Sequence, residues 1–587
     1  MSILASLLRA YERMPDAPAP GYSVEKIGWV ISLNDDGTPA GKPIDLRTGD
    51  GKKRRPRPIL VPQPVTRTVA IAPNFLWDKT AYALGITAGE GKRTVAEHAE
   101  FVAHHEDVLE GTSDHGLLAL LRFVAWWEPA GFVERSWPEE MKDQNVVFAL
   151  ESERHARFIH DREAAKALWA DLSTGGDRTA TTCLVTGEAA TVARLHPPIK
   201  GVWGGQSSGG RMVSFNLDAF ESYGHEQGEN APVSDYAAFA YTTVLNRYLQ
   251  PDSRHRIQIG DASTVFWADA SDTENARIAE SAFGAFFSGD EPAVDEGLEA
   301  GKVGALLRRV RDGEAISDVA PELADGIRFH VLGLAPNAAR ISIRFYVEDD
   351  FGVIAENYRR FVEEMTVEPP PRDGRPPLWR YLLETAVLGK RENVPRNLAG
   401  EWMRAILTGT PYPLTLLSTV LMRIRADGHV NALRVAILKA VLIRNLSRRE
   451  ASVALDKTCT DRGYLLGRLF ATYEHVQRAA LGPKVNATVK DKFYGAASAQ
   501  PQKVFGLLDS GAANHFAKVG KESVGRKIAL EKQLGEIMDL MEPSAQPFPA
   551  HLSGAEQAMF ALGYHHQYSD FFKKKDAPES PVDADAA

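Results

Sequence analysis

The stretch VEPPPRDGRPP, residues 367–377, separates two parts of this chain that carry different sequence patterns. Its prolines fix the backbone in extended conformations and lack the N–H groups that helices and sheets use. We therefore expect an extended, semi-rigid linker at this point. The regions predicted around it are 1–366, the linker 367–377, a helical connector 378–450, a helical bundle 451–572 and a disordered tail 573–587.

On the N-terminal side of the linker, short apolar runs alternate with segments of helical periodicity. The run that ends at Leu33 is followed by Asn34-Asp35-Asp36-Gly37, which predicts a strand and a hairpin turn. The first residues, Met1–Arg13, carry apolar side chains at helical spacing and predict a docking helix. The other helices predicted are 95–108, 116–127, 164–172 and 234–249, and the strands are 27–33, 59–61, 144–150, 182–185, 264–268, 327–331 and 341–347.

On the C-terminal side, apolar residues recur at i, i+3 and i+4 with charged residues between them. The helices predicted there are 398–407, 413–424, 431–445, 461–481, 502–516 and 521–541. The predicted fold class is therefore α+β, with an N-terminal mixed α/β region followed by a C-terminal all-α helical bundle.

The composition excludes several classes of protein. Of the 587 residues, 44% are hydrophobic and 25% are charged, which is typical of a globular protein. Cys183 and Cys459 are far apart, which excludes a disulfide framework and indicates a reducing compartment, so we expect a cytoplasmic location. Apolar runs fall short of the ~18 residues of a membrane span, so no membrane partner is expected. Because the net charge is −9, a nucleic-acid surface must be a local patch.

The familiar catalytic motifs are missing from the sequence. HExxH, GxSxG and an EF-hand loop are absent. The segment Gly204–Arg211 has the glycine spacing of a phosphate-binding loop, but Gly210-Arg211 replaces the Lys-Ser/Thr pair that would hold phosphate and magnesium. His104-His105-Glu106-Asp107 is predicted to lie on a polar helix face. We therefore expect no enzyme activity, no metal and no cofactor.

A basic run stands near the N-terminus. Pro56 and Pro58 interrupt it, so we expect an extended strand edge or loop. It is either a solvated basic turn or a phosphate-binding segment. Its cations are Lys52, Lys53, Arg54, Arg55 and Arg57.

The glycine-rich segment also suits nucleic acid. Glycines remove side-chain bulk, so that backbone N–H groups can approach a phosphate or the floor of a groove. Lys200 and Arg211 flank the segment with positive charge. Hydrogen-bond donors at its centre are Gln206, Ser207 and Ser208. A flexible connecting loop is the alternative interpretation.

The segment Arg67–Asp78 places Asn74 and Phe75 directly after Pro73 in a constrained turn. If both side chains project, the Asn amide can pair with an adenine edge and the ring can wedge a base step open. The alternative is that Phe75 belongs to the core together with Leu76 and Trp77.

These segments belong to a longer series of sequence blocks. The blocks are GWVISLNDDG, RPRPILVPQPVTRT, IAPNFLWD, CLVTGE, LHPPIKGVWGGQSSGGRMVSFN, AFESYG, EQGENAPVSDYAAFAYTTVLN, VFWAD, VLGLAPNAARISIRFY and NVPRNLAGEWMRAIL. In content and order, from the N-terminal helix to about Leu407, they resemble the large subunit of the type I-C CRISPR Cascade.

The resemblance implies a non-catalytic subunit of an RNA-guided surveillance complex. Such a subunit would lie near the 5′ handle of the crRNA, recognise the protospacer-adjacent motif (PAM) on target double-stranded DNA, and help to open the duplex into an R-loop. In RNA-guided systems the guide reads the target by base pairing, while the protein reads only the short PAM. The other partners implied are the Cascade backbone subunits, the 5′-handle subunit and a recruited helicase-nuclease.

The resemblance also suggests roles for single residues. Asn74 and Phe75 would enter a groove at the PAM, while the central donors of the glycine-rich segment would touch the opening strands and the flanking cations would contact phosphates. In the C-terminal bundle, cations outnumber nearby acids, which predicts either a stripe for a single-strand backbone or ordinary solvated helix faces. The stripe comprises Arg468, Arg478, Lys492, Lys503 and Lys518.

The resemblance further implies that the C-terminal helical part is also made separately, from an internal translation start, as a small subunit. No methionine lies between Met422 and Met538, and a start at Met538 leaves too short a fragment to bury a core. We therefore expect a GTG start at Val453 or Val476, or a longer product from Met422.

Two other function classes are open. A metal-dependent nuclease would use scattered acids such as Asp261 and Asp269, which flank the predicted strand 264–268, although acids at such positions are usually turn or cap residues. A purely structural scaffold would contact no DNA.

Overall fold

The computed structural model describes residues 2–49, 54–65, 67, 71–174, 180–269, 273–287, 309–372, 374, 376–482 and 487–573. The chain forms two compact units. Unit 1 comprises Met1–Pro198 and Val213–Leu245, and unit 2 comprises Ile199–Met212 and Asn246–Ala587. The chain therefore passes between the units three times, after Pro198, Met212 and Leu245.

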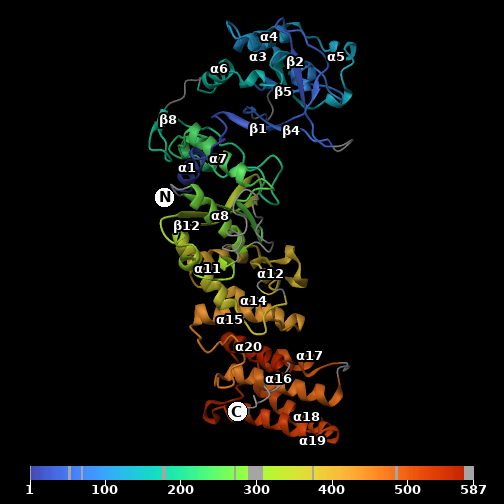
Figure 1. The fold of residues 1–587 in the computed structure, drawn as a ribbon, viewed down its shortest axis with the longest axis vertical. Coiled ribbons are helices and arrows are strands. Elements are labelled where there is room, and N and C mark those ends of the chain that lie inside the picture. The colour runs from blue at the N-terminus through green and yellow to red at the C-terminus, as the bar shows by residue number, and fades with distance from the viewer. Residues whose placement is uncertain are drawn as a thin grey trace, which may run out of the picture. The chain divides into compact units, whose positions relative to one another are not determined.

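Unit 1 is built around a four-stranded mixed sheet in the order β3-β2-β6-β5. Strands β2 and β6 are parallel, with Trp29 opposite Val146, and the two outer strands run antiparallel to their neighbours. Helix α4 packs on β2 and β6 (Figure 1). A separate antiparallel ribbon pairs β1 with β4. The strands are β1 Tyr22–Ile27, β2 Trp29–Leu33, β3 Ile44–Asp45, β4 Arg57–Pro62, β5 Trp77–Lys79, β6 Asn145–Leu150, β7 Ala180–Thr182 and β8 Ala189–Thr191.

Most helices of unit 1 lie close to their predicted positions, while the short helices Thr80–Ala83 and Gly131–Glu134 were not predicted. The helices are α1 Ile3–Glu12, α2 Thr80–Ala83, α3 Thr94–Val108, α4 His115–Trp126, α5 Gly131–Glu134, α6 Glu163–Thr174 and most of α7 Asp235–Tyr248. Helix α1 is capped by Ser2, whose side chain accepts a hydrogen bond from the Ala5 N–H at 3.1 Å. The ring of Tyr11 packs edge-to-face on Tyr236 and Phe239 of α7, so the predicted docking helix is confirmed.

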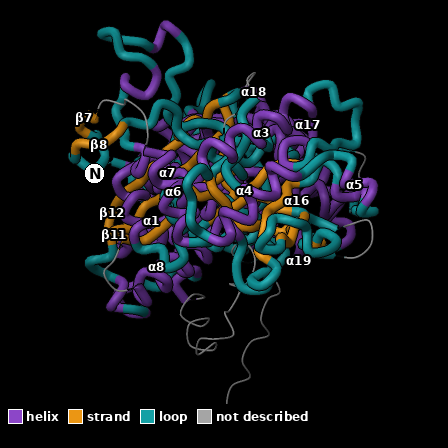
Figure 2. The backbone as a smooth tube through the Cα atoms, turned by 90° about the horizontal axis from the view of Figure 1, so that it is seen from above, coloured by secondary structure: helices purple, strands orange, loops and turns teal. Residues whose placement is uncertain are grey.

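Unit 2 begins with a four-stranded antiparallel sheet in the order β12-β11-β10-β9. The strands are β9 Arg256–Ile259, β10 Ala262–Asp269, β11 Arg328–Asn337 and β12 Arg340–Asp350. Figure 2 shows β11 and β12 side by side, and their register pairs Val331 with Val347. Helices α8 Thr273–Phe287, α11 Phe351–Met365 and α13 Arg396–Thr408 pack against this sheet.

The remaining described elements of unit 2 are helical. Those after the proline-rich linker agree with the predicted helical region, while the short helix Ile316–Val319 was not predicted. The helices are α10 Ile316–Val319, α12 Leu378–Leu383, α14 Leu414–Asp427, α15 Ala432–Leu446, α16 Arg462–Leu481, α17 Val489–Ala497, α18 Pro501–Glu522, α19 Val524–Met538 and α20 Gly554–Asp570. The predicted α+β class, mixed first and helical later, is confirmed. Among the described helices, none combines the length and the apolar character needed to cross a membrane.

One hydrophobic core runs through unit 2, from Ile259 in the sheet to Tyr564 in α20. Val367 and Leu378, on either side of the proline-rich linker, are both members of this core. The compact units therefore divide at other points than the predicted boundaries at 366 and 450, because apolar packing continues across the linker.

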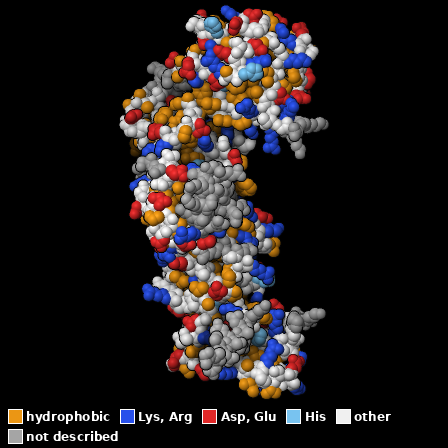
Figure 3. All heavy atoms as spheres, in the orientation of Figure 1, with side chains coloured by type: hydrophobic (Ala, Val, Ile, Leu, Met, Phe, Trp, Pro, Cys, Tyr) orange, Lys and Arg blue, Asp and Glu red, His pale blue; other side chains and the backbone are white. Residues whose placement is uncertain are grey.

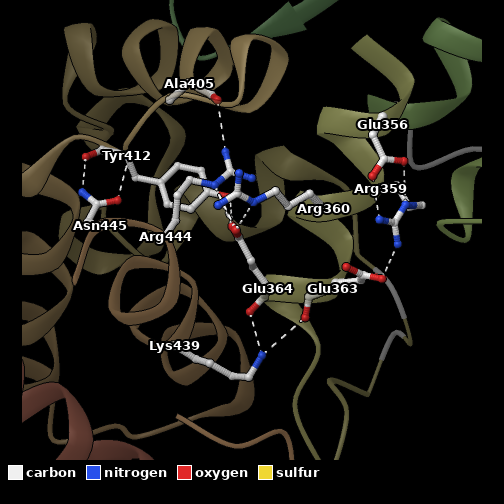
Figure 4. Close-up of polar contacts among 10 residues, drawn as sticks. All are labelled: Glu356, Arg359, Arg360, Glu363, Glu364, Ala405, Tyr412, Lys439, Arg444 and Asn445. Atoms are coloured by element: carbon white, nitrogen blue, oxygen red, sulfur yellow. Dashed lines mark hydrogen bonds and ion pairs between the residues drawn. The ribbon is translucent and has the colours of Figure 1, made fainter. Parts of the chain in front are cut away.

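A buried ionic network fastens α11 to α15 within this core (Figure 4). The Glu364 carboxylate is 2.8 Å from the Arg444 guanidinium and accepts a hydrogen bond from the Tyr412 hydroxyl at 2.7 Å. The Lys439 ammonium donates to the backbone carbonyl of Glu364 at 3.0 Å and so binds the C-terminal end of α11. Removal of one partner would leave the others charged and buried, which is strongly unfavourable.

Candidate nucleic-acid interface

The glycine-rich segment forms a closed loop in unit 2. Ile199 and Gly210 exchange two backbone hydrogen bonds, at 2.8 and 3.0 Å, which close the base of the loop. The Arg211 N–H then donates to the Ala339 carbonyl at 3.3 Å, and the Ile341 N–H donates to the Arg211 carbonyl at 3.0 Å. The base of the loop is therefore anchored to the turn between β11 and β12.

The backbone conformation of the loop requires glycine at two positions. Gly201 and Gly209 both have φ of 85°, a left-handed conformation that favours glycine. A Cβ atom would come within 2.7 Å of the Leu249 carbonyl oxygen at Gly201 and of the Ile199 carbonyl oxygen at Gly209. These glycines therefore allow the backbone to turn tightly on either side of residues 206–208, which form the tip of the loop.

The tip of the loop is exposed. Gln206, Ser207 and Ser208 are all exposed, and the adjacent Trp203 is 60% exposed. Lys200 at the base is exposed and Arg211 is half-buried. Donors, an aromatic ring and cations therefore lie together in one loop, of which the sequence predicted the donors and the cations.

The second wall of this site was not predicted from the sequence. A small pocket beside the loop is lined by Gln206 and Gly210 on one side and by Pro336, Arg340 and Ile341 on the other. Arg340 stands more than a hundred residues away in the sequence, and it is an isolated cation in an ordinary strand pattern. Its bridge to Arg211 is a long-range pairing that no local motif reveals.

The described part of the basic run, from Arg54 to Arg57, leads into strand β4 of unit 1. Arg55 and Arg57 are exposed at the start of β4. Arg54 forms an ion pair with Asp45 at 2.7 Å. Hydrogen bonds from Arg47 are the main reason why the pKa of Asp45 falls to about 2. The extended conformation is confirmed, while the predicted Lys52 and Lys53 lie outside the described residues.

The predicted projection of Asn74 and Phe75 is wrong. Asn74 is 3% exposed and Phe75 is 1% exposed. The Asn74 side-chain oxygen accepts the Val65 N–H at 3.0 Å, and the Phe75 ring stacks on Trp169 with centroids 5.3 Å apart. In this conformation neither side chain can reach a base, and the alternative that Phe75 belongs to the core together with Leu76 and Trp77 is confirmed.

The same turn explains why His105 is not on a polar helix face. His105 is fully buried, and its Nε2 accepts the Leu76 N–H at 2.9 Å while its Nδ1 bonds the Phe101 carbonyl at 2.8 Å. These bonds assign a neutral ring with the proton on Nδ1. Burial lowers the pKa of His105 to about 3.

The predicted single-strand stripe is only partly a surface. Arg478, Lys492, Lys503 and Lys518 are exposed. Arg468 is 4% exposed and donates to Gln567 at 3.1 Å, so its place in the stripe is wrong. Burial lowers the pKa of Arg468 as well. Figure 3 shows cationic and anionic side chains interspersed over the visible face of the described residues.

The acids considered for a nuclease have other partners. Asp261 forms an ion pair with Arg344 at 2.8 Å, and Asp269 lies 4.0 Å from the buried His330. The described part of the chain holds no group of three or more His, Cys, Asp or Glu side chains placed to bind a metal ion.

A family model described as "CRISPR-associated protein (Cas_Csd1)" matches residues 7–572, which is nearly the whole chain. No curated protein matches the chain.

Proposed function

We propose, because this chain belongs to the Cas_Csd1 family of CRISPR-associated proteins, that it is the non-catalytic large subunit of a type I-C RNA-guided surveillance complex in the cytoplasm. Its partners in this proposal are the crRNA, target double-stranded DNA, the Cascade backbone and 5′-handle subunits, a small subunit made from an internal start, and the helicase-nuclease. The family membership supports the proposal that the chain is part of a CRISPR surveillance complex. The exposed residues of the loop 199–211 support the proposed contact with DNA.

The observation that carries the DNA contact is the exposed tip of the loop 199–211. Gln206 can both donate to and accept from a base edge, and Ser207 and Ser208 can donate to phosphate or sugar oxygens. The backbone pairing of Ile199 with Gly210 holds these groups in place before any ligand binds, which lowers the ordering cost. We therefore assign PAM recognition to this loop, with Gln206 as the reader.

The cations would supply the part of the affinity that does not depend on sequence. Lys200 and Arg211 flank the tip, and Arg55 and Arg57 are exposed on the ribbon of unit 1. Each phosphate contact releases counterions, so loss of one such cation weakens every duplex alike and reduces the steepness of the salt dependence by about 1.

The test is duplex binding by the reconstituted crRNA-containing complex, with targets that differ only at the PAM. We expect Gln206→Ala to lose about tenfold of the preference between PAMs, since a good side-chain contact to a base is worth about 1–3 kcal/mol. Lys200→Gln should instead weaken all targets equally. Gln502→Ala, an exposed glutamine on α18, is the matched control. An unchanged preference in a fully assembled Gln206→Ala complex would contradict the reader assignment.

A further inference from the structure

An exposed apolar side chain occupies a strained turn in unit 2, outside the loop described above. Leu388 is 78% exposed and its φ is 58°, a conformation that is unfavourable for a residue with a Cβ. Gly389 follows with φ of 62°, and the Lys390 N–H donates to the Val387 carbonyl at 3.3 Å. Both central residues are therefore left-handed, as in a type I′ turn, where glycine or asparagine is the usual choice.

Hydrogen bonds from the following segment hold this turn. The Asn393 side-chain amide donates to the Val387 carbonyl at 2.9 Å, and the Asn393 N–H donates to the Lys390 carbonyl at 3.0 Å. Leucine at position 388 gains neither burial nor a favourable backbone conformation, although the turn itself is well fixed. Strain combined with an exposed apolar group is typical of a contact surface for another molecule.

An aromatic side chain contacts the segment that follows the turn. Trp379 of α12 is 37% exposed. The guanidinium carbon of Arg391 lies 5.4 Å from the centre of its ring, and that of Arg380 lies 5.7 Å from it. Cations over an indole ring hold its orientation, and the exposed part of Trp379 is accessible to another planar group.

The charge of this surface is positive. Segment 387–397 carries three cations, Lys390, Arg391 and Arg396, and one acid, Glu392, all of them exposed. None of the three cations forms an ion pair with another described residue. Exposed cations interleaved with an aromatic and an apolar side chain are the composition of a surface that follows a nucleic-acid backbone and stacks on its bases.

We propose that Trp379, Leu388 and the cations of 387–397 bind a single strand of nucleic acid. Unpaired bases would stack on Trp379 and pack against Leu388, while the cations contact the phosphates. The strand must be single because paired bases do not offer their faces to an indole ring. This surface is separate from the duplex contact of loop 199–211 and does not depend on it.

The experiment measures the fluorescence polarisation of a fluorescein-labelled oligothymidine strand with the full-length chain. We expect Trp379→Ala and Leu388→Gly each to weaken binding about tenfold. Because glycine adopts the left-handed conformation without strain, Leu388→Gly should keep or raise the thermal midpoint, which separates binding from folding. Ser447→Gly, at another left-handed position with φ of 52°, and Lys457→Gln, at an exposed lysine elsewhere, are the matched controls and should bind like the wild type.

Three results would overturn the proposal. The first is that the wild-type chain does not bind the strand. The second is that Trp379→Ala and Leu388→Gly both bind the strand with wild-type affinity. The third is that these variants bind the strand normally but do not assemble into the complex. The last result would assign the surface to a protein partner. Gln206→Ala should leave strand binding intact, so a failure of this proposal is distinguishable from a failure of the duplex contact.

Discussion

Asn74 stabilises its turn by hydrogen bonds from a buried position. Its side chain accepts the Val65 N–H, and its own N–H donates to the Asp78 carboxylate at 2.8 Å. Arg67 pairs with the same carboxylate and lies 3.9 Å from the centre of the Tyr82 ring. Burial raises the pKa of Asp78, and the Arg67 guanidinium opposes this effect. The side chains that define the turn are thus paired to one another.

We expect Asn74→Ala to lower the free energy of unfolding by about 1–3 kcal/mol, because it removes the acceptor of a part-buried N–H group. Urea denaturation of the full-length chain measures this loss. The control is Asn514→Ala, at an exposed position of α18, where alanine should be neutral or slightly stabilising. Wild-type stability together with an altered PAM preference would show that the Asn74 amide reaches DNA.

At the residue scale, the sequence identified candidate segments correctly more often than it predicted the direction of their side chains. The turn after Pro73 was evident, but its inward direction depends on His105, whose ring binds the Leu76 N–H from 29 residues further along the chain. The sequence predicted a loop at residues 199–211 because glycines mark positions where the backbone adopts conformations that other residues disfavour. Arg340 was missed because only a long-range backbone pairing places it beside the loop.

At the element scale, helices α16 and α20 approach until their backbones touch. A Cβ atom at Gly467 would overlap the Phe560 carbonyl oxygen, and one at Gly563 would overlap the Tyr464 carbonyl oxygen. Gly463, one turn before Gly467, faces Glu556 in the same way. This close approach lets α16 bury nearly all of its circumference, including Arg468.

Gly467→Ala should therefore destabilise the chain by about 3 kcal/mol, since the added methyl group has no space between the two backbones. The midpoint of urea denaturation measures the change. Gly511→Ala in α18, where no atom lies within 4 Å of the position that the added methyl group would take, is the control and should stabilise by up to about 1 kcal/mol. Equal effects of the two substitutions would contradict the close packing.

The helices were predictable because their apolar period is regular over many residues. The sequence did not show that α16 is buried on several sides, and so its cations suggested a surface stripe. Gly463 and Gly467, four residues apart, were the available signal for close packing. Short strands such as β3 and β5 carry too few residues for a period to be detected.

At the scale of the whole molecule, burial lowers the pKa of many histidines. The pKa falls to about 3 for His105 and His566, and to about 4 for His475 and His565. In the unfolded chain these groups take up protons near pH 6.5. Acidification therefore charges the unfolded state before it charges the folded one.

We expect the contribution of these histidines to stability to be complete above about pH 6.5 and to fall as the pH decreases toward about 4, because the unfolded state binds more protons in this window. Asp45 and Glu153, whose pKa values fall to about 2, lose their stabilising charge only at still lower pH. Urea midpoints of the full-length chain at about pH 7.5 and about pH 5 measure the effect. A midpoint that rises on acidification through this window would contradict it.

The three passages of the chain between the units also bear on recombination. The loop 199–211 and the β11–β12 turn that anchors it are encoded far apart, with part of unit 1 between them. A crossover between related genes anywhere from residue 213 to residue 335 would join the loop of one parent to the anchoring turn of the other. Although the two units are compact, recombination cannot exchange one of them as a single continuous gene segment. The loop and the turn that anchors it must therefore evolve together.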